Sequence, residues 1–336
     1  MKAIVRDAYG EVDVLRLGEI ATPVAGEGEV LLRVVAAGVD QGVWHLLTGT
    51  PYAMRLAGFG VRAPKNPLLG WDVAGRVEAV GTGVTTFRPG DEVFGTCRGA
   101  FAEYVAARAD RLVSKPDNVN FEQAAVVPIS GYAALQAVRE HGRVRAGQRL
   151  LVIGASGGVG TFAVQIAKAY GAEVTGVCST SKVDLVRSLG ADHVIDYTRE
   201  EIGDGRNRYD VIVDIAGNRP LSQLRRALTP RGTLVIVGGE DSGKWLGMRR
   251  QLRASALSPF VRQKLGTFIS KERRQDLEEL RALLESGAIR PDRQDVPADC
   301  GSRGDQLPQK RPRARQDRHH RLTEGGRKRE PEAPPR

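Results

Sequence analysis

Two patterns of apolar and polar residues divide the chain. Up to residue 120 the apolar residues form short runs, such as residues 28–39 and 73–84, separated by turns that contain Gly and Pro. Short runs with such turns are typical of a compact β-rich domain. From residue 121 to 261, strand-like runs alternate with segments of helical spacing, which predicts parallel βαβ units joined by right-handed crossovers. The pattern therefore predicts an α/β protein with a doubly wound parallel sheet beside a β-rich domain.

The second region begins with a helical segment at 121–138. Strands are then expected at residues 150–154, 173–178, 193–197, 210–215 and 233–239. Helices are expected at 159–171 and 182–190, each closed by a Gly that suits the end of a helix. Asp214 is expected to end its strand, and a further helix is predicted within 274–291.

Composition sets broad limits on function. The chain has 336 residues, enough for about two domains of roughly 150 residues. No run approaches the ~20 apolar residues of a membrane span, and the N-terminus lacks a signal-peptide core, so a cytoplasmic protein without a membrane partner is expected. Cys97, Cys178 and Cys300 fit no metal-ligand spacing. The net charge of +10 suits an anionic ligand and does not by itself indicate nucleic acid.

The strongest chemical motif is a glycine-rich loop at residues 154–160, Gly-Ala-Ser-Gly-Gly-Val-Gly. It follows an expected buried strand and opens an expected helix, which is the context of a dinucleotide site. Glycines permit a tight turn and a close approach of the backbone to a pyrophosphate, and the helix N-terminus supplies unpaired N–H groups. The residues predicted to bind the cofactor here are Ala155, Ser156, Gly157, Gly158 and Val159.

The choice between NADPH and NADH is expected at the end of the second strand. Sites for NAD usually carry Asp or Glu there, to bind the ribose hydroxyls. This chain has Ser179, Thr180 and Lys182, with no acidic residue before Asp184. Hydroxyl groups and a lysine suit a 2′-phosphate, so NADPH is the predicted cofactor. The alternative is that Lys182 simply begins a solvated helix face.

Several motifs together resemble the quinone oxidoreductase/zeta-crystallin branch of the medium-chain dehydrogenase/reductase superfamily. They are Gly147-Gln148, the glycine loop with Gln165 and Lys168, Lys2-Ala3, Gly90-Asp91-Glu92-Val93 and Ala191 through Tyr197. The resemblance covers residues 1–291. It implies a GroES-like catalytic domain at 1–120, to which 262–291 return, and a Rossmann domain at 121–261, with the cofactor between the two domains. By the same resemblance, Tyr197 lies against the adenosine phosphate, Gly238 lies near the nicotinamide ribose, and a homodimer is expected.

The chain departs from its zinc-dependent relatives at their metal ligands. Those relatives carry Cys near the position of Asp40 and a Gly-His-Glu triplet, where this chain has Gly70-Trp71-Asp72. A Trp side chain cannot bind zinc, so no metal is expected, and a quinone or conjugated enone is a more suitable substrate than an alcohol. Asp40 and Tyr52 are the candidate catalytic residues, since that region faces the nicotinamide in relatives. Tyr52 is a possible proton donor or substrate hydrogen-bond partner; for both residues the alternative is packing at the domain interface.

Residues 292–336 contain no aromatic residue and few apolar ones, so disorder is expected. Family members continue here with a helix and a final strand that complete the catalytic domain. Codons permitted for these residues, read from their second base, allow I-D-K-T-Y-P-L and, later, a stop at the Leu322-Thr323 junction. We therefore expect a frameshift near Pro291.

Other functions stay open at this point. An enoyl-thioester or 2-alkenal reductase would use the same cofactor loop and differ only in its substrate pocket. A non-catalytic NADPH-binding protein is favoured if the altered C-terminus is genuine. Binding of nucleic acid is disfavoured, because the basic tail lacks aromatic residues on which bases could stack.

Overall fold

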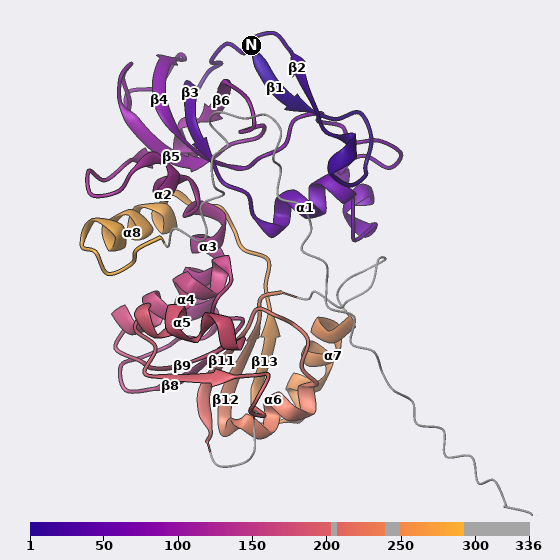
Figure 1. The fold of residues 1–336 in the computed structure, drawn as a ribbon, viewed down its shortest axis with the longest axis vertical. Coiled ribbons are helices and arrows are strands. Elements are labelled where there is room, and N and C mark those ends of the chain that lie inside the picture. The colour runs from indigo at the N-terminus through magenta and orange to yellow at the C-terminus, as the bar shows by residue number, and fades with distance from the viewer. Residues whose placement is uncertain (203–206, 239–248, 292–336) are drawn as a thin grey trace, which may run out of the picture.

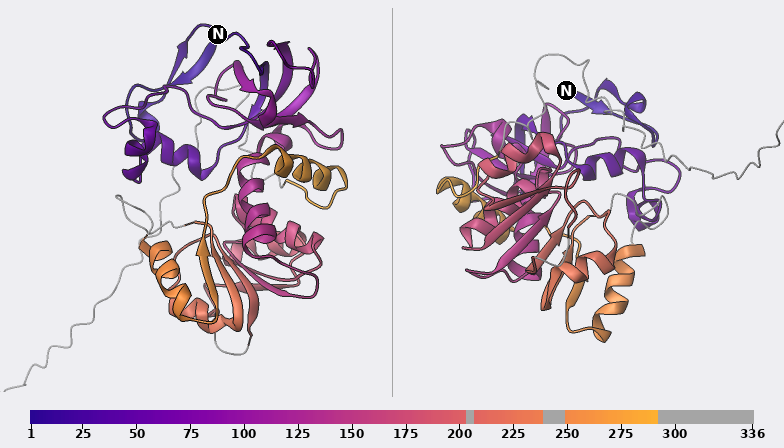
Figure 2. Two further views of the ribbon diagram at one scale, coloured as in Figure 1. Left: turned by 180° about the vertical axis from the view of Figure 1, so that it is seen from behind. Right: turned by 60° about the horizontal axis from the view of Figure 1, so that its bottom comes forward.

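A computed structural model of the chain describes residues 1–202, 207–238 and 249–291. It contains two domains that lie one above the other, with helices α3 and α8 between them (Figures 1 and 2). None of the described helices is long and apolar enough to cross a membrane. The tail at 292–336, its expected disorder and the suspected frameshift lie outside the described residues.

The N-terminal domain is built on a five-stranded antiparallel sheet of order β6-β3-β4-β5-β7. Its inward side chains, among them Val30, Leu32 and Val93, are fully buried. The hairpin β1–β2 lies beside this sheet, and α1 (Gln41–Thr48) lies between β3 and β4 in the chain. The strands are β1 (Lys2–Val5), β2 (Arg16–Glu19), β3 (Glu29–Ala37), β4 (Asp72–Val80), β5 (Glu92–Thr96), β6 (Tyr104–Arg108) and β7 (Leu112–Ser114).

The second domain contains a six-stranded parallel sheet of order β10-β9-β8-β11-β12-β13. This is the strand order of a Rossmann fold, so the predicted doubly wound sheet is confirmed. The strands are β8 (Arg149–Ile153), β9 (Glu173–Cys178), β10 (His193–Asp196), β11 (Tyr209–Asp214), β12 (Leu228–Ile236) and β13 (Lys264–Thr267). The helices are α4 (Gly158–Ala169), α5 (Val183–Ser188), α6 (Leu221–Ala227) and α7 (Arg249–Leu257).

Both faces of this sheet are buried, because successive side chains of a strand point to opposite faces. Along β8, Leu150 and Val152 pack into one core cluster, and Leu151 and Ile153 pack into another. The first cluster includes Phe162 of α4, and the second includes residues of α6 and α7. Burial on both faces explains why the sequence here reads as continuous apolar runs.

Three helices join the domains: α2 (Phe121–Ala125), α3 (Pro128–Gln136) and α8 (Arg274–Glu285). The first expected domain boundary, at 120/121, lies before α2. In the structure α2 packs against the N-terminal sheet, so this boundary falls later in the chain. The second, at 261/262, moves because β13 pairs with β12 and extends the Rossmann sheet to Thr267. The return to the N-terminal domain is made by the segment after β13, where α8 packs on both α3 and β7.

Candidate functional site

The predicted cofactor residues gather at one edge of the Rossmann sheet. Gly154 follows β8, Ser179 follows β9, Tyr197 follows β10 and Gly238 lies just beyond β12. In a parallel sheet, segments that follow the strands lie at the same carboxyl edge. The strand order reverses between β8 and β11, and dinucleotides bind at this kind of switch point.

The glycines of the loop differ in the space around them: Gly157 has room beside it, whereas Gly160 has none. A Cβ atom at Gly160 would lie 2.0 Å from the carbonyl oxygen of Gly154, so α4 can pack this closely only with glycine there. A Cβ at Gly157 would meet nothing nearer than 3.6 Å, and Gly157 is exposed. The open side at Gly157 is therefore where a pyrophosphate fits against the start of α4.

Not every predicted N–H group of the loop is available to a ligand. The N–H of Ala155 donates to Val177 O at 3.0 Å, and that of Gly157 donates to Gly154 O at 3.1 Å. Gly158 and Val159 begin α4, where the first N–H groups of a helix have no partner within it. The geometry fits a nicotinamide dinucleotide, with Gly158 and Val159 as its backbone donors and Ala155 as a buried support.

The hydroxyl groups after β9 have a partner that the sequence did not suggest. The Oγ1 of Thr180 donates to Asp196 Oδ2 at 2.6 Å. Asp196 also accepts bonds from the backbone N–H and the Oγ1 of Thr198. These bonds, that from Thr180 first, lower the pKa of Asp196 and keep it ionised. A carboxylate therefore lies beside the expected 2′-phosphate position, brought there by the neighbouring strand β10.

Basic residues lie on the loops near this carboxylate. Lys182 is half-buried at the end of the short 3-10 turn Thr180–Lys182. Tyr197 is 49% exposed, and the guanidinium of Arg219 lies over its ring at 6.0 Å from the centroid. Arg199 is 3.5 Å from Asp196. Both arginines were missed from the sequence. Arg199 follows the predicted Tyr197 by only two residues, which was a signal for it, whereas Arg219 comes from the loop after β11, which only the fold brings to Tyr197.

A buried ion pair lies at the carboxyl end of β11. Asp214 ends this strand, as predicted, and is fully buried. Its carboxylate accepts bonds from Gly217 N–H at 3.1 Å and from the guanidinium of Arg250. Burial raises the pKa of Asp214, whereas Arg250 opposes that shift. A Cβ at Gly238 would lie 2.3 Å from Ile215 O, so the two loops touch where the nicotinamide ribose is expected.

In the N-terminal domain, Asp40 caps helix α1. Its Oδ1 accepts a bond from Val43 N–H at 2.9 Å, whereas Oδ2 is buried without a partner among the described residues. Burial raises the pKa of Asp40. It raises the pKa of Asp72 well above the ordinary range, with further contributions from Asp40 and Glu272. A raised pKa favours the neutral acid, which can donate a proton.

Tyr52, the other candidate catalytic residue, is half-buried after α1. The guanidinium of Arg55 lies over its ring, 4.8 Å from the centroid, and over the ring of Tyr9 at 4.3 Å. Arg55 also donates to Gly49 O at 2.9 Å. These contacts tie Tyr52 to the loop that follows α1, and they are compatible with either packing or a chemical role.

Trp71 lies beside α1, where a Cβ at Gly42 would be 3.0 Å from its ring. Within the described ranges there is no group of three His, Cys, Asp or Glu residues able to hold a metal ion. Burial, together with Asp72 and Glu272, raises the pKa of the Cys97 thiol and keeps it protonated. Cys97 is therefore unsuited to act as a nucleophile.

Two sequence families match the chain. Residues 26–117 match the alcohol dehydrogenase GroES-like domain, and residues 158–286 match the zinc-binding dehydrogenase family. These matches fall on the N-terminal and Rossmann domains respectively. The first confirms the GroES-like prediction for the β-rich domain.

Two relatives and one solved structure illustrate the similarity. The NADPH-dependent alkenal/one oxidoreductase of Arabidopsis thaliana is 39% identical over 237 residues, 65% of this chain and 58% of that protein. The quinone oxidoreductase of Mus musculus is 31% identical over 301 residues, 85% of this chain and 86% of that one. The Escherichia coli quinone oxidoreductase complexed with NADPH superimposes with a TM-score of 0.72 and 25% identity, covering 86% of this chain and 89% of that chain.

Proposed function

The chain belongs to the quinone oxidoreductase branch of the medium-chain dehydrogenase/reductase superfamily, and on that premise we propose that it reduces a quinone or a conjugated enone with NADPH. The observation that carries this proposal is the loop at 154–160, open at Gly157 and followed by the unpaired N–H groups of α4. A bound nicotinamide dinucleotide would supply the hydride.

Preference for NADPH rests on charge at the edge of the site. Arg219 lies over the ring of Tyr197, and Lys182 ends the short turn that follows Ser179. We assign these two cations to the 2′-phosphate. Asp196 opposes this preference, but its two carboxylate oxygens are occupied by Thr180 and Thr198. The cations therefore outweigh it, and NADPH binds more tightly than NADH.

We assign proton transfer to the carboxyl group of Asp40, whose pKa is raised by burial. Its Oδ2 has no partner among the described residues, and its buried position favours the protonated form. Asp40 donates this proton to the oxygen or carbon that becomes basic after hydride addition. Tyr52 binds the substrate oxygen in this proposal, or replaces Asp40 as the donor.

The test is a fluorescence titration with NADPH and NADH, on the unmodified chain and on Lys182→Gln. Loss of one charge-assisted bond costs about 1.5–3 kcal/mol, so NADPH should bind about tenfold to 100-fold more weakly to Lys182→Gln. Binding of NADH should change little. Arg187→Gln, on the following helix α5 with a 65% exposed side chain, is the matched control. Equal weakening for both cofactors would contradict the 2′-phosphate assignment.

A 2-alkenal or enoyl-thioester reductase is the second candidate. It is supported by the relative named alkenal/one oxidoreductase, of which this chain spans 58%. Comparing kcat/KM for a benzoquinone, a 2-alkenal and an enoyl thioester separates the two. Tight binding of NADPH without turnover of any of the three would instead support a non-catalytic NADPH-binding protein. The expected homodimer remains a prediction.

A further inference from the structure

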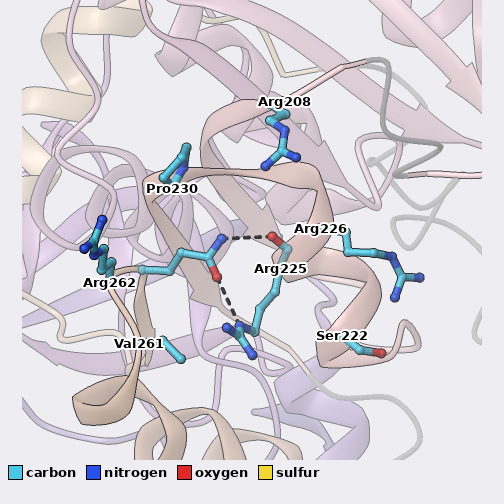
Figure 3. Close-up of a pocket in the computed structure, with 8 residues that line it drawn as sticks. Arg208, Ser222, Arg225, Arg226, Pro230, Val261 and Arg262 are labelled. Atoms are coloured by element: carbon cyan, nitrogen blue, oxygen red, sulfur yellow. Dashed lines mark hydrogen bonds between the residues drawn. The ribbon is translucent and has the colours of Figure 1, made fainter.

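A pocket lined by arginines lies at the opposite edge of the Rossmann sheet from the cofactor loop. Its volume is about 570 Å³. Arg208 comes just before β11, Arg225 and Arg226 end α6 before β12, and Arg262 comes just before β13 (Figure 3). The remaining lining residues are Ser222, Pro230, Val261 and Gln263. The four arginines therefore come from the last turn of α6 or from the amino ends of the strands, and a strand of six residues spans about 20 Å between this edge and the carboxyl edge.

The positive charge of this pocket is not balanced by its lining. Of the described residues that form its wall, four are arginines and none is acidic. None of the four has an ion pair with another described residue. A second pocket at the same edge carries Arg143, Arg145, Arg231 and Lys264, but it also contains Glu140 and Asp210. The first pocket therefore carries more unbalanced positive charge than the second, in which two carboxylates offset two of the four cations.

Arg225 is held in position before any ligand arrives. Its Nε donates to Gln263 Oε1 at 3.0 Å, and Gln263 Nε2 donates back to Arg225 O at 2.9 Å (Figure 3). Gln263 also reaches Thr229 O at 3.3 Å. This clamp uses only the Nε of the guanidinium, and the described residues supply no partner for its two Nη groups. A fixed guanidinium loses little conformational entropy when it binds an anion.

Arg208 is held more loosely. Its Nη1 donates to Leu228 O at 3.4 Å, and its own carbonyl oxygen accepts a bond from Arg149. The pocket therefore combines one guanidinium held by Gln263, that of Arg225, with three exposed arginines, Arg208, Arg226 and Arg262. Guanidinium groups bind phosphate oxygens through paired N–H donors.

We propose that this pocket binds an oligophosphate, either an inorganic one or the phosphate chain of a nucleotide. One fixed arginine and three exposed ones match an anion with several charged phosphate groups better than one carboxylate. The site is separate from the cofactor loop, so the proposal does not depend on the reaction that the protein catalyses.

Isothermal titration calorimetry of the full chain with tripolyphosphate, with and without saturating NADPH, tests the proposal. One saturable site that is retained in the presence of NADPH is expected. Arg225→Gln should weaken binding at least tenfold. Gln263→Ala, which keeps the charge and removes the clamp, should weaken it severalfold. Arg231→Gln removes the same charge from the neighbouring pocket, and it should change the Kd less than twofold.

Two results would overturn the proposal. One is the absence of saturable binding at millimolar tripolyphosphate, and the other is equal weakening by Arg231→Gln and Arg225→Gln, which indicates diffuse attraction only. Thermal unfolding followed by circular dichroism verifies that each variant is folded. Titration with ATP distinguishes the two sources: equal affinity indicates recognition of the phosphates alone, and tighter binding of ATP indicates a nucleotide.

Discussion

Asp72 carries a buried carboxyl group whose protonation changes on unfolding. Only 2% of the residue is exposed, and its Oδ1 accepts a bond from Ile129 N–H at 3.1 Å. Burial and the neighbouring Asp40 and Glu272 raise its pKa well above the ordinary value. The folded chain therefore holds a proton at pH values where the unfolded chain has already lost it.

This difference in bound protons predicts the pH dependence of stability. Above the unfolded Asp pKa of about 3.9, the folded state binds more protons at Asp72 than the unfolded state. The stability that Asp72 contributes is thus fully present below that pKa. As pH rises from there toward the higher pKa of the folded state, the free energy of unfolding falls by up to about 1.4 kcal/mol per pH unit. Asp72→Asn keeps the acceptor for Ile129 and removes the titration.

Urea unfolding of the unmodified chain and of Asp72→Asn across a pH series measures this effect. We expect the free energy of unfolding of Asp72→Asn to increase relative to that of the unmodified chain as pH rises above about 4. Asp184→Asn, at a fully exposed side chain on α5, is the control and should run parallel to the unmodified chain. Parallel curves for Asp72→Asn as well would show that Asp72 does not titrate differently on folding.

At single residues, the sequence predicted positions better than contacts. Strand and helix order alone bring Ser179, Tyr197 and Gly238 to one edge, because a parallel sheet collects the ends of its strands there. The sequence could not reveal that Thr180 donates to Asp196, since that bond depends on the register Asp196↔Cys178 between β10 and β9. Nor could it reveal that Ala155 N–H is already bonded to Val177 O.

Between elements, a buried ion pair fastens α8 to the helical segment that includes α3. Asp276 of α8 has a side chain that is 1% exposed, and it accepts bonds from Arg139 Nη2 at 2.5 Å and from Gln136 Nε2 at 2.7 Å. Removing one partner of a buried pair leaves an uncompensated charge. The contact therefore stabilises the junction through which the chain returns to its N-terminal domain.

Arg139→Met is expected to lower the free energy of unfolding by about 3–5 kcal/mol. The double variant Arg139→Met/Asp276→Leu should recover part of this loss, because it removes the buried charge of Asp276, whereas the half-buried Glu140 and Glu279 still lose Arg139 as a partner. Arg281→Met, which breaks only the surface pairs with Glu278 and Glu285, should cost no more than about 1 kcal/mol. Urea denaturation of the three variants measures these values. A double variant as unstable as Arg139→Met would indicate that lost packing, not the unpaired charge, causes the effect.

Most elements were predictable because their apolar periodicity is strong. The strand at 173–178 coincides with β9, and α4 begins one residue before its predicted start. The predicted helix at 121–138 is instead divided, because Val126 ends α2 and Pro128 starts α3. Strand β13 was missed because its four residues, Lys-Leu-Gly-Thr, are too short to show a period, and only pairing with β12 makes them a strand.

For the whole molecule, we propose that residues 292–336 result from a frameshift, and that the shifted reading restores the family's closing helix and strand. Replacing residues 292–336 by that reading should raise the free energy of unfolding by several kcal/mol, since each buried Val, Leu or Ile contributes about 1.5–3 kcal/mol. A scrambled version of the same replacement is the control. Urea unfolding measures the gain, and genomic DNA with an intact frame through this region would refute the proposal.

The path of the chain between its two domains has a mechanical consequence. The chain crosses once between α2 and α3, at the N-terminal end of α3, and again after β13. The second crossing lies beside the other end of α3, because Gln136 bonds both the N–H and the carbonyl oxygen of Lys271. These two covalent connections lie at opposite ends of one helix. Rotation about the α3 axis, some 13 Å long at 1.5 Å per residue, is therefore the relative motion of the domains that these two connections restrict least.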